Sequence, residues 1–128
     1  MKLLLDTCTF LWALTGDPPL PPRVANLVRN PDNEIFLSAA SAWEIAIKYA
    51  AGKLTLPEHP ERFVPAMRGE RGFTALAVDE ESALHASRLP ALHRDPFDRL
   101  LVSQAIVHGL IILTPDPLVA RYPARTMW

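Results

Sequence analysis

The stretch Leu3-Leu4-Leu5-Asp6-Thr7 joins an uninterrupted apolar run to an acidic residue close to the start of the chain. A second apolar run, Leu110-Ile111-Ile112-Leu113, is followed three residues later by Asp116. Continuous apolar runs of this length are typical of strands that are covered on both faces, as in a parallel sheet. Because parallel strands end at one edge of their sheet, we expect Asp6 and Asp116 to lie close together.

The rest of the chain alternates strand-like and helix-like patterns. This alternation predicts an α/β fold, a three-layer sandwich in which a parallel sheet of about five strands carries helices on both faces. With 128 residues and no repeat or linker, the chain is expected to form one domain over residues 1–128. Strands are expected at 2–5, 34–37, 73–78, 110–113 and 124–127, and helices at 7–14, 21–29, 39–51, 60–69, 79–88 and 96–108.

The composition is that of an ordinary globular protein, with 49% hydrophobic and 21% charged residues. The single cysteine, Cys8, excludes an internal disulfide. Asp6 interrupts the first apolar run too early for a signal peptide, and the apolar run at 105–113 is too short to span a bilayer. We therefore expect a cytoplasmic protein without a membrane partner.

Charge and glycine placement narrow the function classes. The net charge of −1 carries no basic signature, but neutralising four acidic residues would bring it to +3, so local charge matters more than the total. The five glycines form no phosphate-binding loop, which excludes a P-loop protein or a nucleotide-binding dehydrogenase. A phosphoacceptor receiver domain would need paired acids at Asp6 and a lysine late in the chain, whereas the last lysine is Lys53.

Two more acids are predicted to reach the edge where Asp6 and Asp116 lie. Glu44 lies in the second turn of the helix that follows the strand at 34–37, and Asp98 opens the helix at 96–108. Carboxylates packed this closely raise one another's pKa values unless a cation holds them. Four oxygen ligands favour Mg²⁺ or Mn²⁺ over Zn²⁺, and none of the four histidines shows a metal-ligand spacing.

Each acid also has a purely structural interpretation. Asp6 and Asp116 are candidate helix N-caps, Asp98 complements a helix dipole, and Glu44 can pair with Lys48. Glu44 weakens this alternative, because its helix is apolar nearly all round and an unpartnered acid is costly to bury there. Capping alone does not explain four acids at one sheet edge.

Four stretches together resemble the PIN-domain family, and in particular the VapC toxin ribonucleases of type II toxin–antitoxin operons. Each stretch is a weak signal alone, but the four occur in the right order beside the right predicted elements, and the similarity runs from Met1 to the closing residues 122–128. They are Leu3-Leu4-Leu5-Asp6-Thr7, Ser38-Ala39-Ala40-Ser41-Ala42-Trp43-Glu44-Ile45, His93-Arg94-Asp95-Pro96-Phe97-Asp98-Arg99 and Leu113-Thr114-Pro115-Asp116.

The resemblance implies a PIN-like sandwich and an endoribonuclease that depends on Mg²⁺ or Mn²⁺ and cleaves RNA with metal-activated water. It also implies a homodimer and an antitoxin whose C-terminal segment blocks the site. Asp6, Glu44, Asp98 and Asp116 match the family's acidic quartet and are expected to be catalytic and metal-binding. Asp6 and Asp98 are the expected direct ligands, while Glu44 and Asp116 bind a second ion or orient metal-bound water.

Further residues are assigned supporting roles around the quartet. Asp95 is expected to cap the helix at 96–108, because Pro96 suits the first helical position, and this leaves Asp98 free to face the site. Arg94, Arg99 and Lys48 are candidates for phosphate contacts, with solvated or paired surface charge as the alternative. The supporting residues are Thr7, Thr114 and Asp95.

Several alternatives stay open at this point. One alternative is a chain that keeps the fold and acts as a non-catalytic interaction or RNA-binding module. Another is the same chemistry on DNA, since no residue identifies a reader of the RNA 2′-hydroxyl. Cys8 departs from the histidine or asparagine common in the family and is interpreted as a core thiol rather than a nucleophile. Phe10, Leu11 and Trp12 are interpreted as core, with an apolar groove for a partner helix as the alternative.

Overall fold

The apolar runs form the predicted all-parallel sheet of five strands, and the structure gives their order as β3-β2-β1-β4-β5. The computed structural model describes residues 1–128 in full. β3 is shorter than the predicted 73–78 because only β2 pairs with it, so backbone pairing ends where that neighbour ends. The strands are β1 (Lys2–Leu5), β2 (Glu34–Ser38), β3 (Thr74–Leu76), β4 (Ile111–Leu113) and β5 (Arg125–Met127).

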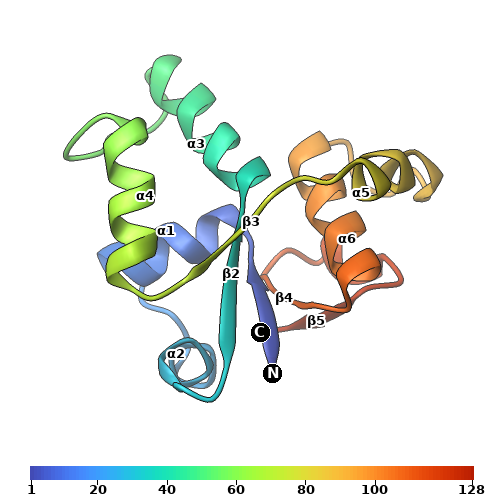
Figure 1. Ribbon diagram of the computed structural model, residues 1–128, viewed down its shortest axis with the longest axis horizontal. Helices are drawn as coiled ribbons and strands as arrows, with labels where there is room; N and C mark the ends of the chain where they lie inside the picture. Colours follow the sequence, from blue (N-terminus) through green and yellow to red (C-terminus); the bar gives the residue numbers. More distant parts are fainter.

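Helices cover both faces of this sheet, which confirms the predicted three layers (Figure 1). The predicted helix at 79–88 divides into α5 and a tighter 3₁₀ turn, a common way for a helix to end. None of the helices combines the length and the apolar character that crossing a bilayer requires. They are α1 (Thr7–Thr15), α2 (Pro22–Arg29), α3 (Ala39–Ala50), α4 (Pro60–Glu70), α5 (Glu80–His85), η1 (Ala86–Arg88), α6 (Pro96–His108) and η2 (Val119–Arg121).

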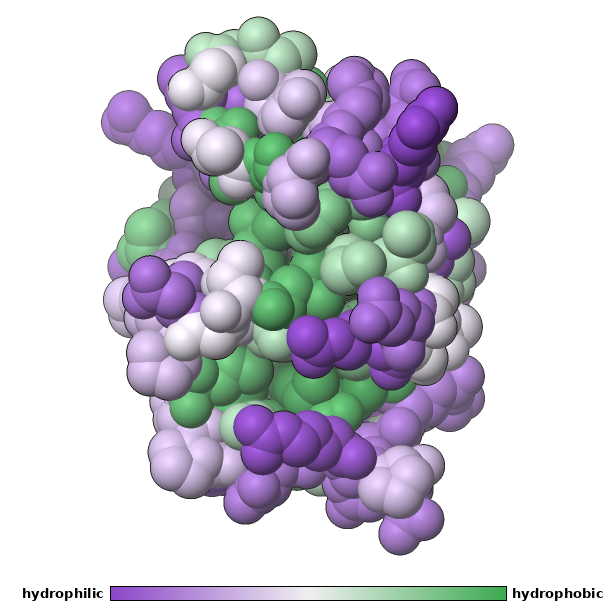
Figure 2. Space-filling view, turned by 90° about the vertical axis from the view of Figure 1, so that its left-hand side faces the viewer, coloured by the Kyte–Doolittle hydropathy of each residue, from purple (hydrophilic) through white to green (hydrophobic).

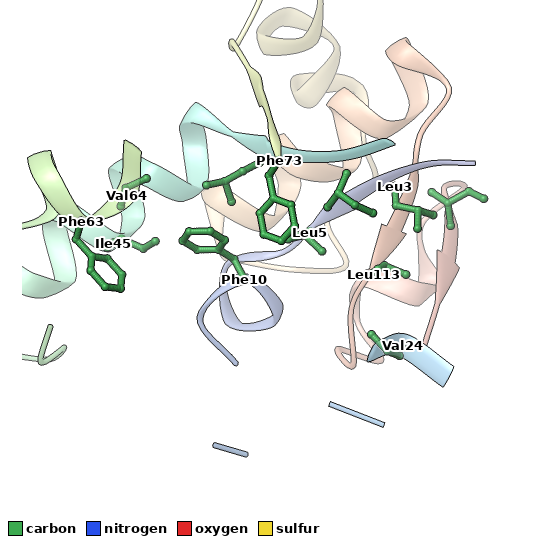
Figure 3. Packing of buried hydrophobic residues seen from close by; sticks show 12 residues of the cluster. Leu3, Leu5, Phe10, Val24, Ile45, Phe63, Val64, Phe73 and Leu113 are labelled. Carbon is green, nitrogen blue, oxygen red and sulfur yellow. The ribbon is translucent and has the colours of Figure 1, made fainter. Parts of the chain in front are cut away.

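The leucines of β1 show why the first run is apolar without interruption. Successive side chains of a strand point to opposite faces, and here each face is covered. Leu3 and Leu5 pack into the cluster that joins the sheet to α1, α2, α3 and α4, where Phe10 and Phe73 meet edge to face (Figure 3). Leu4 packs into the second cluster, against α6 and η2. All three leucines are fully buried.

The strand order places a crevice at one edge of the sheet. From β1 the chain moves outward through β2 to β3, then returns across to β4 and β5 on the other side of β1. Ligands of parallel α/β sheets bind at the carboxyl ends of the strands where the order reverses in this way. Leu5 is in register with both Leu37 and Leu113, so the residues that follow these three strands leave the sheet at one level.

Candidate active site

The carboxyl ends of β1 and β4 border a cavity of about 360 Å³. All four acids predicted from the sequence line it, each delivered by a different part of the chain: the end of β1, α3, α6 and the segment after β4. Two lysines, three apolar residues, one threonine, one cysteine and a further aspartate complete the wall. The lining residues are Asp6, Thr7, Cys8, Leu11, Glu44, Ile45, Lys48, Lys53, Leu54, Asp95, Asp98 and Asp116.

Asp6 serves both the helix and the cavity. Its Oδ1 accepts hydrogen bonds from the backbone N–H of Thr9 over 2.8 Å and from Cys8 Sγ over 3.3 Å, which caps α1. Its Oδ2 accepts no hydrogen bond, and the residue is only 5% exposed. The capping interpretation and the site interpretation are therefore compatible, because each uses a different oxygen.

Glu44 is buried, as its apolar helix predicts, and both of its oxygens are held. Thr7 Oγ1 donates to Oε1 over 2.5 Å, and Lys48 Nζ donates to Oε2 over 2.7 Å. This bond to Glu44 raises the pKa of Lys48 against the opposing effect of burial. The predicted Glu44–Lys48 pair and the site thus coexist, with Thr7 and Lys48 fixing the carboxylate at the cavity wall.

Asp95 caps α6 as predicted, and Asp98 takes no part in that cap. Asp95 is the N-cap of α6, since its Oδ1 accepts from the Phe97 N–H over 2.9 Å. Asp98 accepts no hydrogen bond from the backbone of α6, and its Oδ2 lies 3.1 Å from His93 Nε2. Burial and the negative charges of Asp95, Asp6 and Glu44 raise the pKa of Asp98 to about 7. Asp98 is thus the least compensated carboxylate of the cluster.

Asp116 is better compensated than Asp98. Its Oδ1 accepts from the Leu118 N–H over 2.8 Å, and its Oδ2 accepts from His93 Nε2 over 2.9 Å. Burial alone would raise the pKa of this carboxyl, but the hydrogen bonds from His93 and Leu118 hold it below its usual range. Thr114 is buried behind it, and its Oγ1 accepts the backbone N–H of Asp116 over 3.1 Å, which supports the assigned supporting role.

Sequence reasoning missed two residues of the site, His93 and Lys53. The nitrogen of His93 and one oxygen each from Asp98 and Asp116 lie within 4.8 Å of one another. The spacing between histidines could not predict these contacts, because the partners of the His93 ring are carboxylates and not other histidines. The available signal was position: His93 immediately precedes a helix that must begin at the acidic edge. Lys53 follows α3 and lines the cavity beside Lys48.

The structure corrects the assignment of Arg99 to phosphate contacts. The Arg99 guanidinium does not reach the cavity and is used inside the fold, where it donates to the Tyr122 hydroxyl and to backbone carbonyls of residues 86, 89 and 90. Arg99 was assigned to phosphate contacts because it is a positive charge next to Asp98 in the sequence. That position does not determine the direction in which a long side chain points. Arg94 is exposed and does not line the cavity, and its phosphate role stays a prediction.

Cys8 behaves as a thiol rather than a nucleophile. Burial, the charge of Asp6 and the hydrogen bond to Asp6 raise the pKa of the Cys8 thiol to about 12. A thiol, unlike a thiolate, is a poor nucleophile.

The apolar residues of α1 and α3 differ in part from expectation. Phe10 is fully buried and so cannot line a groove, whereas Leu11 and Trp12 are half-buried, with Trp12 packed edge to face on Trp128. α3 is not covered all round. Trp43 is 63% exposed, and Ile47 is 44% exposed.

Comparison with known proteins identifies the family of this chain. The profile of the PIN domain matches residues 3–124, nearly the whole chain. The chain belongs to the PIN-domain family. Among curated proteins, the ribonuclease VapC16 of Mycobacterium tuberculosis is 35% identical to this PIN domain, in an alignment covering 66% of this chain and 74% of the relative.

Solved structures share the fold over the full length. A chain of VapBC2 from Rickettsia felis, bound to a promoter DNA fragment, matches with a TM-score of 0.74 at 17% identity. A chain of DNA-bound VapBC from Salmonella typhimurium matches with a TM-score of 0.68 at 22% identity. Both alignments cover 99% of this PIN domain, and they cover 98% and 97% of the matched chains. These similarities establish the fold.

The donor set of this PIN domain fits a hard divalent cation. Asp6 Oδ2 accepts no hydrogen bond, and the contact of Asp98 is that of its Oδ2 with His93 Nε2 at 3.1 Å, although both residues line one cavity. Glu44 and Asp116 stand beside them with their oxygens already partnered. Buried negative charge without a partner is costly, and carboxylate oxygens are the ligands that Mg²⁺ and Mn²⁺ prefer.

The raised pKa of Asp98 leads to a prediction for the metal-free protein. The folded state holds this proton more tightly than the unfolded chain does, so the stability that the Asp98 carboxyl contributes is greatest at low pH and is lost as the pH rises through about 7. We expect the melting temperature to fall between about pH 5 and about pH 8, and Asp98→Asn to flatten that fall. Thermal unfolding with EDTA present measures it, with the exposed Asp17→Asn as control. An unchanged slope in Asp98→Asn would contradict the assignment.

Proposed function

We propose that this PIN domain is an endoribonuclease that depends on Mg²⁺ or Mn²⁺ and acts as the toxin of a toxin–antitoxin pair. The observation that carries the proposal is the pair of carboxylates Asp6 and Asp98, each with one oxygen that accepts no hydrogen bond, in one cavity with Glu44 and Asp116. The 35% identity to a protein named ribonuclease VapC16 supports RNA as the substrate class.

The four acids have different roles in this proposal. Asp6 and Asp98 would bind the cation directly, since each offers oxygen lone pairs that no other group uses. Glu44 and Asp116, already hydrogen-bonded, would bind a second ion or orient water. When bound, the cation activates a water molecule and offsets charge on the phosphodiester.

Basic residues at the cavity would contact the phosphate backbone. Lys48 and Lys53 both line the cavity, and Lys48 is half-exposed while it pairs with Glu44. Such contacts position a nucleic acid without reading its sequence. Arg94 is exposed on the segment that leads to Asp95, and we retain it as a third candidate.

Asp95 and Asp98 provide a matched pair for testing catalysis. Asp98→Asn should keep the fold and lower RNA cleavage by orders of magnitude, because it removes a direct ligand. Asp95→Ala should cost about 1 kcal/mol of stability, typical of a lost helix cap, with activity reduced only modestly. Unfolding curves and cleavage of a tRNA and rRNA panel, with Mg²⁺, Mn²⁺ or EDTA, measure both.

The outcomes of that experiment separate the alternatives. Metal-loaded protein that binds RNA but cleaves none of the panel would favour a non-catalytic module. Cleavage of DNA oligonucleotides in preference to RNA would show that DNA is the substrate of the same chemistry. An essential Asp95 beside a dispensable Asp98 would show that the third acid is assigned wrongly.

We further propose that the protein forms a homodimer through the exposed apolar face of α3. Trp43 meets Phe97 edge to face at 5.4 Å between ring centroids, and Ile47 continues the same surface. Exposed apolar patches of this kind mark protein–protein contacts. The patch borders Glu44, Lys48 and Asp95, so a dimer formed there would bring two acidic cavities close together.

Trp43→Glu tests the dimer. We expect the wild-type protein to elute with twice the monomer mass in light scattering, and Trp43→Glu to elute as a monomer with unchanged circular dichroism. Leu84→Glu, on the exposed surface of α5, is the matched control and should stay dimeric. If Trp43→Glu stays dimeric, the interface lies elsewhere; weaker RNA binding by that dimer would assign the patch to RNA.

A different apolar face is proposed for the antitoxin. Figure 2 shows apolar surface between polar patches on the side where α1, α2 and α4 lie in Figure 1. Half-buried residues of these helices, such as Leu14, Leu27 and Met67, pack over the core cluster. An amphipathic helix can pack its apolar side against apolar surface of this kind. The matched structures are of VapBC proteins, which supports a partner of this class.

Copurification after co-expression with the product of the neighbouring reading frame tests the antitoxin face. Leu14→Ala should weaken capture at least tenfold, because it removes apolar contact area, while the control Leu84→Ala should leave capture unchanged. If Leu14→Ala lowers the melting temperature yet captures the partner normally, Leu14 is a core residue and this face is not the binding site.

A further inference from the structure

We propose that His93 is a positioning residue of the acidic site, whose Nε2–H holds the carboxylates of Asp116 and Asp98 in the arrangement that a divalent cation needs. The inference rests on the proposed metal centre. The imidazole is largely buried, with 14% of its side chain exposed. Its Nε2 lies 2.9 Å from Asp116 Oδ2 and 3.1 Å from Asp98 Oδ2, so one ring bridges two acids from different parts of the chain.

The backbone determines which ring nitrogen carries the hydrogen. The N–H of Asp95 donates to His93 Nδ1 over 3.1 Å, so Nδ1 must present a lone pair. In a neutral imidazole the hydrogen then lies on Nε2, the atom that faces the two carboxylates. His93 therefore donates to Asp116 and does not accept from it.

The same geometry argues against His93 as a metal ligand in its own right. Coordination through Nε2 would need a lone pair there and a hydrogen on Nδ1. That hydrogen would face the N–H of Asp95, which would lose its acceptor. The residue with the unpaired N–H would be the N-cap of α6, the helix that carries Asp98. His93 is better suited to hold the ligands than to join them.

The fold fixes His93 from its other side. Its backbone N–H donates to the Tyr122 hydroxyl over 2.9 Å, and Arg99 donates to the same oxygen over 3.1 Å. Arg99 also donates to carbonyl oxygens at residues 86, 89 and 90. The segment 86–95 is thereby fastened to α6 and to buried Tyr122, which gives the imidazole a fixed place.

Without the ring, Asp116 would keep only the Leu118 N–H, on Oδ1. Its Oδ2 would then be free to rotate toward solvent, since Asp116 lies in an irregular segment after β4. Asp98 would lose its nearest positively polarised neighbour. Hydrogen bonds that orient metal ligands are typically worth tenfold to a hundredfold in metal affinity.

Two polar variants test this role. The amide of His93→Gln can place an N–H near the position of imidazole Nε2, whereas the amide of His93→Asn reaches only to the position of Nδ1. Calorimetric titration of EDTA-treated protein with MnCl₂ should show about tenfold or more weaker binding for His93→Asn and near wild-type binding for His93→Gln. His108→Asn is the control, because His108 Nε2 also contacts an aspartate, Asp79, at 2.7 Å but outside the cavity.

Nitrogen NMR of the metal-free wild-type protein supplies a second readout, in which His93 should carry its hydrogen on Nε2. Unchanged Mn²⁺ affinity in His93→Asn, equal losses in both variants, or a hydrogen on Nδ1 would each overturn the positioning role. Wild-type protein that binds no Mn²⁺, with the Nε2 hydrogen in place, would instead contradict the proposed metal centre itself. The two failures are therefore distinguishable.

Discussion

The register of β1 between β2 and β4 is the constraint on which the rest of the molecule depends. Leu5 pairs with both Leu37 and Leu113, so β1 and β4 end at one level, and β2 ends one residue beyond it at Ser38. Slipping one strand by a single residue would turn its leucines from one cluster toward the other, where the space is already filled. The core therefore fixes the register, and the register brings the acids together.

The buried carboxylates at this edge differ in how many hydrogen bonds they accept. Glu44 is held by Thr7 and Lys48, while one oxygen of Asp6 is used to cap α1. Asp98 has no comparable partner, and its pKa rises accordingly. A cluster in which every acid was neutralised by a side chain would be more stable and would have no use for a cation. The uncompensated oxygens mark where the fold gives up stability for binding.

Local structural roles and site roles do not compete in this molecule. Asp6 and Asp95 are both N-caps, and both line the cavity, because helices that follow parallel strands begin at the edge where ligands bind. A helix start needs an acceptor for its free N–H groups, and the site needs carboxylates, so one residue type suits both. For the same reason, finding a capping role for an acid says little against a functional one.

The strands, the helices, the parallel sheet and the four acids could all be predicted from the sequence, because apolar runs and capping residues act over a few neighbouring positions. It also separated Asp95 from Asp98, through the fixed preference of Pro96 for the first turn. The directions of several side chains could not be predicted in this way, because they depend on the packing of distant elements. The His93 ring contacts the acidic cluster, the Arg99 guanidinium donates to backbone carbonyls away from it, and Trp43 is exposed. These outcomes depend on contacts between residues far apart in the chain, which no local pattern records.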